Sequence, residues 1–173
     1  YGLKSSFNYT LNKLVDINFG INVIYYNSFP GVVEPFDEES LINPHELETE
    51  RAFEGAFFIS NDQIITDWLS LSYGLRFTGY GSFGPRTIFE YDPGFSKSIL
   101  SVVDTVAHTS NDLIKQYSGI EPRFLAKIKT GNNSSLKLSY NRTKQYINLI
   151  FNTVSPSPTD IWKLSDYHFR PQS

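Results

Sequence analysis

The chain has 173 residues, enough for one ordinary domain, and 40% of them are apolar, 19% charged and 16% aromatic. The net charge of −3 provides no basic surface for nucleic acid, and the absence of cysteine excludes disulfides, thiolate metal sites and cysteine nucleophiles. With 14 Phe and 11 Tyr, the composition favours strands over helices, and no apolar run approaches the ~20 residues of a membrane helix.

The first two expected strands form a hairpin. Apolar residues alternate with polar ones from Tyr1 to Leu11, and again from Val15 to Tyr25. Asn12-Lys13 is expected to be the short turn between them. Successive side chains of a strand point to opposite faces of the sheet, so each of these strands has one apolar and one polar face.

A long irregular loop is expected over residues 27–49, which contain three prolines and many acidic residues. The third strand is expected from about Phe53 to Ser60, and residues 61–66 are expected to lead into the fourth. Phe58 interrupts the polar face of this third strand. The fourth strand, from Asp67 to Gly81, alternates strictly between apolar and polar residues.

A second long irregular region is expected over residues 82–116, with a short helical turn near 99–106. The fifth strand is expected over about 117–130 and ends in a tight turn at 131–134. The sixth strand begins at Ser135 and fades near Ile147. A third long loop is expected from there to residue 173.

The expected connections therefore alternate between short and long. This sorting is typical of an outer-membrane β-barrel, which has short periplasmic turns, long extracellular loops and strands that alternate apolar-out and polar-in. Lys13 and residues 62–67 and 131–134 would then lie at the periplasmic end. Small bacterial barrels start at about eight strands, and open edges are prohibitive in lipid, so six strands indicate a segment of a larger barrel.

Specific stretches of the chain resemble a known family. The block from Glu50 to Asp62, followed by Ile65-Thr-Asp-Trp-Leu-Ser-Leu-Ser-Tyr-Gly-Leu-Arg76, resembles a strand pair of TonB-dependent outer-membrane receptors of the Bacteroidetes type. Glu121-Pro-Arg123 and the run from Ser134 to Ile147 are similar to the same barrel. The resemblance implies a barrel of about 22 strands with a plugged lumen, together with a plug domain and a TonB-binding segment that are absent from residues 1–173.

The sequence is therefore interpreted as all-β, an antiparallel transmembrane β-barrel segment in the bacterial outer membrane. The resemblance implies active uptake of a bulky nutrient (siderophore, vitamin, glycan or peptide). It also implies outer-membrane lipid and TonB as partners, and it allows a substrate-binding surface lipoprotein. A passive porin or adhesin barrel and a secreted β-sandwich binding module are the alternatives. An enzyme, a cofactor and a nucleic-acid partner are not expected.

Two sets of candidate residues follow from the alternation. The candidates for lumen-facing contact with plug or substrate, or for charge pairing along a wetted wall, are Arg76, Glu121, Arg123, Lys127, Lys137 and Asn141. The expected lipid-facing residues are Leu69, Leu71, Tyr73, Leu75 and Phe77. Aromatic residues that are expected either to anchor the barrel at the membrane interfaces or to pack ordinarily are Tyr25, Tyr26, Trp68, Tyr80 and Tyr140.

No metal site is expected. The acidic loop from Glu34 to Glu50 contains carboxylates that Ca²⁺ prefers, but it lacks the regular spacing of a calcium loop and is interpreted as a solvated loop. His45, His108 and His168 stand singly in three expected loops and are interpreted as surface residues rather than iron or haem ligands.

Overall fold

The chain forms a six-stranded antiparallel sheet in which every strand pairs with its neighbours in the order β1-β2-β5-β6-β9-β10. The computed structural model describes residues 1–29, 31–35, 37, 45–46, 48–131, 133–150 and 161–173. The strands of the sheet are β1 (Gly2–Asn12), β2 (Val15–Ser28), β5 (Glu50–Thr66), β6 (Leu69–Phe83), β9 (Leu113–Lys129) and β10 (Ser135–Asn141). The all-β prediction and its six antiparallel strands are confirmed.

Smaller hairpins occupy the regions that were expected to be irregular. The pairs are β3 (Val32–Val33) with β4 (His45–Glu46), β7 (Arg86–Tyr91) with β8 (Val102–His108), and β11 (Ile147–Ile150) with β12 (Ile161–Leu164). A single 3-10 turn, η1 (Ile99–Ser101), precedes β8. The expectation of irregular chain over residues 82–116 was therefore wrong, and the helical turn near 99–106 is confined to its first three residues.

Strand ends also differ from the prediction. Residues 61–66 belong to β5 because Asn61, Asp62 and Gln63 pair with β2 on one side and β6 on the other. The fourth strand begins at Leu69 rather than Asp67, since Asp67 and Trp68 form the turn. The fifth begins four residues earlier than expected, and the sixth ends at Asn141 rather than near residue 147.

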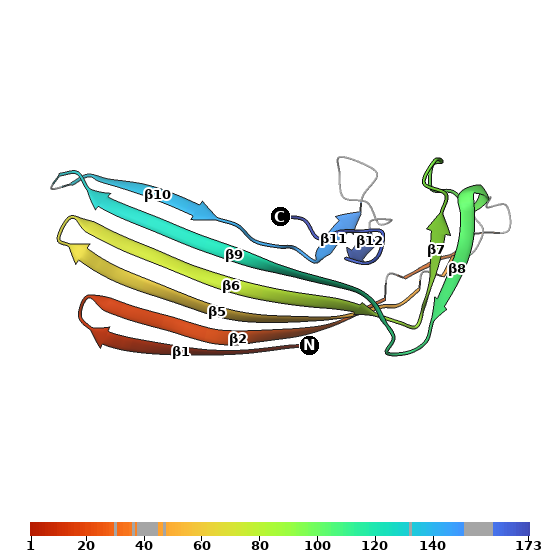
Figure 1. Ribbon diagram of the computed structural model, residues 1–173, viewed down its shortest axis with the longest axis horizontal. Coiled ribbons are helices and arrows are strands. Elements are labelled where there is room, and N and C mark those ends of the chain that lie inside the picture. Colours follow the sequence, from red (N-terminus) through yellow and green to blue (C-terminus); the bar gives the residue numbers. More distant parts are fainter. Residues whose placement is uncertain (30, 36, 38–44, 47, 132, 151–160) are drawn as a thin grey trace.

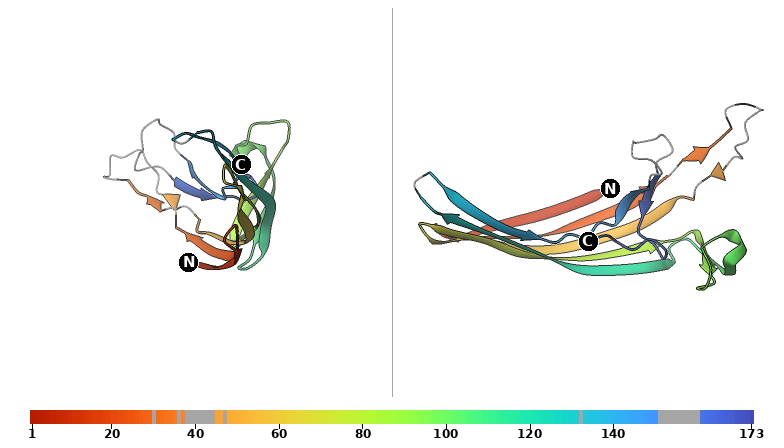
Figure 2. Two further views of the ribbon diagram at one scale, coloured as in Figure 1. Left: turned by 90° about the vertical axis from the view of Figure 1, so that its left-hand side faces the viewer. Right: turned by 90° about the horizontal axis from the view of Figure 1, so that it is seen from above.

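The connections are sorted between the two ends of the sheet. The short turns that join β1 to β2, β5 to β6 and β9 to β10 lie together at one end, and the long excursions lie at the other (Figure 1). We call these the short-turn end and the long-loop end. The sheet is curved, and the C-terminal part of the chain lies within the curve (Figure 2).

The cross-strand register gives the sheet an apolar and a polar face. Phe77 is opposite Phe57 on one side and Ile120 on the other, whereas its neighbour Arg76 is opposite Glu121. Directly opposed residues of an antiparallel pair share a face. The exposed large apolar side chains on the first face are Leu3, Phe7, Tyr9, Phe19, Ile21, Tyr25, Phe53, Phe57, Ile59, Tyr73, Leu75, Phe77, Ile120, Phe124, Leu136, Leu138 and Tyr140.

The compact core of the described residues is small and lies on the polar face near the long-loop end. Ala52, Tyr80, Tyr146 and Leu164 are buried together there. Ordinary soluble domains bury their apolar residues instead of exposing them on one side of a sheet. In the described part of the chain, no helix is long and apolar enough to cross a bilayer.

One glycine permits a close approach within the polar face. A Cβ at Gly20 would lie 2.8 Å from the ring of Phe58 and would collide with the Ser5 carbonyl. Phe58 is directly opposite Gly20, so its ring covers the space that a side chain would otherwise fill. This explains the aromatic residue that interrupts the polar pattern of the third strand.

Candidate functional site

All six predicted lumen-facing residues lie on the polar face of the sheet. Arg76 on β6 is directly opposite Glu121 on β9, and Arg123 is opposite Asn141 on β10. Lys127 and Lys137 are also directly opposed, which places two like charges side by side. The structure thus brings these residues into three cross-strand pairs along β6, β9 and β10.

Arg76 lies between two carboxylates. Its guanidinium nitrogens lie 3.5 Å from a carboxylate oxygen of Glu54 and 3.5 Å from one of Glu121. Glu121 is only 2% exposed, and its other oxygen accepts a hydrogen bond of 2.9 Å from the backbone N–H of Lys144. Tyr26 donates a hydrogen bond of 2.8 Å to Glu54. Charge pairing along the wall is therefore the role that the geometry gives to Arg76 and Glu121.

A second ionic network at the long-loop end joins the chain at the start of β5, the start of β7 and the region around β12. Arg86, at the start of β7, lies 3.4 Å from Glu50 and 2.9 Å from Asp166, both of which are buried. Lys163 on β12 forms ion pairs with the same two carboxylates, at 3.0 Å from Asp166. Glu48 lies 3.7 Å from Arg86 at the exposed rim of the network.

The described residues from 142 onward, which we call the C-terminal segment, are bound to the polar face. The hydroxyl of Tyr80 donates a hydrogen bond of 2.7 Å to the Ser165 carbonyl, and that of Tyr117 donates one of 2.7 Å to the Asp166 carbonyl. The ring of Tyr146 stacks on Tyr80 with 4.6 Å between centroids. The segment therefore covers the polar face at the long-loop end, within the curve of the sheet (Figure 2).

The pKa of the Asp166 carboxyl is lower than its usual value. Burial alone would raise this pKa, but the charge of Lys163, the backbone N–H of Phe169 and the charge of Arg86 outweigh that effect. The charged form of Asp166 is therefore the form that the folded C-terminal segment stabilises.

Sequence reasoning missed five of the residues in these networks. Glu50, Glu54, Arg86, Lys163 and Asp166 were not among the lumen-facing candidates. Four of them come from stretches expected to be loops, and Glu54 lies in the expected third strand. One signal was present in the third strand. Glu54 stands between two small residues on the polar face, and small neighbours leave room for partners from elsewhere in the chain.

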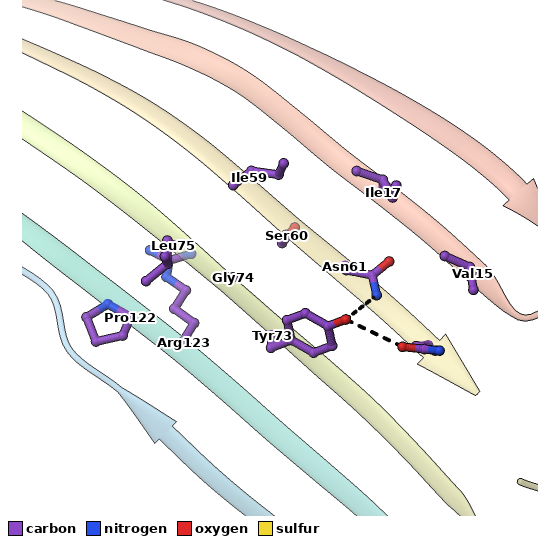
Figure 3. Close-up of a pocket in the computed structure, with 11 residues that line it drawn as sticks. Val15, Ile17, Ile59, Ser60, Asn61, Tyr73, Gly74, Leu75, Pro122 and Arg123 are labelled. Carbon is purple, nitrogen blue, oxygen red and sulfur yellow. Dashed lines mark hydrogen bonds between the residues drawn. The ribbon is translucent and has the colours of Figure 1, made fainter. Parts of the chain in front are cut away.

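The five predicted lipid-facing residues lie on the opposite, apolar face. Leu75 and Phe77 are 54% and 55% exposed, respectively. A shallow groove of about 690 Å³ runs along this face and includes Tyr73, Asn61 and Gln63 (Figure 3). Asn61 donates a hydrogen bond of 2.9 Å to the hydroxyl of Tyr73, which lies 3.4 Å from the Gln63 amide oxygen (Figure 3). These contacts pair polar groups on an otherwise apolar surface.

The predicted aromatic anchors divide between the two faces. Tyr25 and Tyr140 are exposed on the apolar face, and Trp68 is exposed in the β5–β6 turn. Tyr26 and Tyr80 lie on the polar face, where Tyr26 binds Glu54 and Tyr80 binds the C-terminal segment. Of the two roles considered for Tyr26 and Tyr80, the structure therefore shows packing and hydrogen bonding within the protein.

The histidines show no shared site among the described residues. His168 lies 3.0 Å from the Phe89 carbonyl and 3.4 Å from the Lys97 amine, and His108 is opposite Arg86. Most of the acidic loop considered for Ca²⁺, and the side chain of His45, lie outside the described residues. Within the part that the structure describes, no group of three or more acidic or histidine side chains could hold a metal ion.

Comparison of the chain with protein-family models, with curated proteins and with solved structures finds no match.

Proposed function

We propose that this sheet is part of the wall of a TonB-dependent outer-membrane transporter that takes up a bulky nutrient. Its apolar face contacts lipid and its polar face lines the lumen. The observation that carries the proposal is the exposure of large apolar side chains on the same face of all six strands. A contiguous apolar surface of this extent marks a partner surface or a membrane.

The dimensions of the strands support lipid as that partner. β6 has 15 residues and β5 has 17, so at ~3.3 Å per residue they extend for about 45–55 Å. A barrel strand tilted by about 40° then rises through about 35–40 Å, more than the ~25 Å apolar band of an outer-membrane barrel. β5 and β6 can therefore cross this band and extend beyond it, whereas β10, with 7 residues, is shorter than the band.

The sorted connections support an orientation. Outer-membrane barrels have short turns on the periplasmic side and long loops outside. In this orientation the network of Arg86, Glu50, Lys163 and Asp166 lies near the extracellular mouth, and the C-terminal segment narrows the lumen there. Substrate would approach from the long-loop end and meet this segment first.

The two edge strands of the sheet, β1 and β10, require further strands beside them in a membrane. β1 and β10 each pair on one side in the described sheet. In lipid their free N–H and C=O groups require partners, since no water is present to satisfy them. The complete wall therefore includes strands on both sides of these six. The TonB coupling and the plug come from the resemblance in Glu50–Arg76.

The first experiment measures how the whole polypeptide that contains these strands associates with membranes. We expect it to stay in the outer-membrane fraction after extraction with alkaline carbonate, and to require detergent or lipid for folding. Monomeric, cooperative folding in buffer alone would refute the proposal. It would favour a soluble β-sandwich, in which a second layer covers the apolar face.

The second experiment tests energy coupling. Once a transported nutrient is identified, uptake should stop when TonB is removed or the proton gradient is collapsed. A passive porin would continue to equilibrate the nutrient under both conditions. Continued uptake would therefore refute the transporter while leaving the membrane location intact.

A further inference from the structure

Charge is sorted between the two flanks of the polar face near the short-turn end. Asp16 on β2 is directly opposite Asp62 on β5, and Lys127 on β9 is directly opposite Lys137 on β10. Like charges in directly opposed positions destabilise a sheet. Two such pairs, of opposite sign, therefore lie on either side of β6.

These charges are not neutralised within the described part of the protein. None of the four side chains lies within ion-pair distance of an opposite charge there, although Ser72 donates a hydrogen bond to Asp62. The networks around Arg76 and Arg86 differ in this respect, because there each charge contacts its opposite. Among the described residues, the two pairs thus form a separation of charge that no ion pair neutralises.

A groove lies between the two pairs. It has a volume of about 280 Å³. Asp16 and Asp62 line one flank together with Lys13 of the β1–β2 turn, and Lys127 lines the other; Leu14 and Leu125 also contribute to the lining. The hydroxyl-bearing residues Ser70 and Ser72 of β6 lie between the flanks. The volume is just below the ~300–1,000 Å³ of usual ligand sites, which suits a small ligand with two charged ends.

The register sets the distance between the flanks. Asp62 is opposite Ser72, and Lys127 is opposite Ser70. Two strand spacings of ~4.8 Å, with an offset of two residues, place the Cα atoms of Asp62 and Lys127 about 12 Å apart. The polar face is the concave face of the sheet, because the C-terminal segment that is bound to it lies within the curve (Figure 2), and side chains on a concave face converge.

We propose that this groove binds a short zwitterionic peptide of about three residues. Its terminal ammonium lies at Asp62, beside Asp16, and its carboxylate at Lys127. Three extended residues span at most about 10–11 Å, which fits the separation of Asp62 and Lys127, whereas the charges of a single amino acid are too close together. The inference rests on the proposed function and identifies peptides as its substrate class.

The test is equilibrium binding of trialanine to the full-length protein in detergent, measured by calorimetry. Trialanine should bind with a dissociation constant of about 0.1–1 mM, a value ordinary for a ligand of its size, and salt should weaken it. N-acetyl-trialanine amide, which has the same length without the terminal charges, and free alanine should bind at least tenfold more weakly. No binding of trialanine, or equal binding of the capped peptide, would overturn the proposal.

Charge-neutral variants locate the site. Asp62→Asn and Lys127→Gln should each weaken trialanine binding about tenfold, the effect of losing one charge-assisted hydrogen bond. The matched controls Asp104→Asn and Lys97→Gln, far from the groove at the long-loop end, should leave binding unchanged. Equal effects of the groove and control variants would refute the site.

The outcomes also separate this inference from the proposed function. A protein that stays in the membrane fraction but does not bind trialanine refutes the peptide groove alone. A protein that folds in buffer and binds trialanine refutes the membrane wall alone.

Discussion

A single charge on the apolar face tests whether that face contacts lipid. Phe77 is the ninth of 15 residues in β6, about 26 Å along the strand from Leu69 and about 20 Å from Phe83. With a tilt of about 40°, these lengths become heights of about 20 Å and 15 Å, so Phe77 lies near the middle of the apolar band. Leu71 lies only about 5 Å in height from the strand end, at the margin of the same band.

The expected cost of Phe77→Arg is about 2–4 kcal/mol, because an arginine at the bilayer midplane loses its hydration. This corresponds to a roughly 30- to 1,000-fold shift in the folding equilibrium. Leu71→Arg on the same face should cost about 0–1 kcal/mol, since it lies near the interface. Ser139→Arg, on the exposed polar face, should stay within about 0.5 kcal/mol.

The assay is reversible unfolding of the full-length protein from lipid vesicles in denaturant, followed by the fluorescence of Trp68 and Trp162. The decisive quantity is the difference between Phe77→Arg and Leu71→Arg, because both replace an apolar residue on one strand and one face. Equal costs would show that depth is irrelevant and would refute the lipid assignment. Costs near zero for both would show that this face is in water.

Three further predictions concern the C-terminal segment and the packing of the sheet. Arg86→Met leaves the buried carboxylates of Glu50 and Asp166 with one cation fewer. It should destabilise the C-terminal segment by about 2–3 kcal/mol, which is less than the cost of breaking a buried ion pair completely, because Lys163 remains as a second cation. An unchanged rate of limited proteolysis of the segment would contradict this. Because the pKa of Asp166 is depressed in the folded protein, its carboxylate stabilises the C-terminal segment above pH ~4, and this stabilisation is lost as the pH falls through the folded pKa. Limited proteolysis across this pH range should therefore show release of the segment at low pH, and Asp166→Asn should make its proteolysis less dependent on pH. Gly20→Ala should cost about 1–3 kcal/mol in denaturant unfolding through overpacking, whereas Gly79→Ala, whose added methyl has open space, should be nearly neutral.

Alternation was a reliable guide where each strand could be read from its own residues. Leu69, Leu71, Tyr73, Leu75 and Phe77 share one face as predicted, because the period of two follows from strand geometry alone. The prediction was wrong where alternation stopped but pairing continued. Asn61 and Gln63 place polar groups on the apolar face, yet their backbones pair on both sides.

The β7–β8 hairpin was missed because turn signals outweighed strand signals. Gly84-Pro85 and Pro93-Gly94 indicated irregular chain. The β-branched and aromatic residues between and after them, such as Ile88 and Val106, were a usable sign of strands.

The candidate site was predicted only in part. The local alternation predicted that Arg76 and Glu121 lie on the polar face. Only the cross-strand register of β6 and β9 shows that they are directly opposed. The contact of Tyr80 with Ser165 joins residues 85 positions apart, and no local periodicity encodes such a contact. The ionic network at Arg86 depends on three connections that meet in space, so it became visible only in the folded chain.

The segregation of short and long connections has a consequence for how such a chain can vary. Loop closure entropy rises only slowly with length, so residues can be added to the excursions between β2 and β5 or between β6 and β9 at small thermodynamic cost. The ladder between neighbouring strands would keep its register, since β2, β5, β6 and β9, which flank these excursions, each pair with two neighbours. Insertions and deletions should therefore accumulate at the long-loop end except at Glu50, Arg86 and Asp166, where a change of length would break the network that joins the connections.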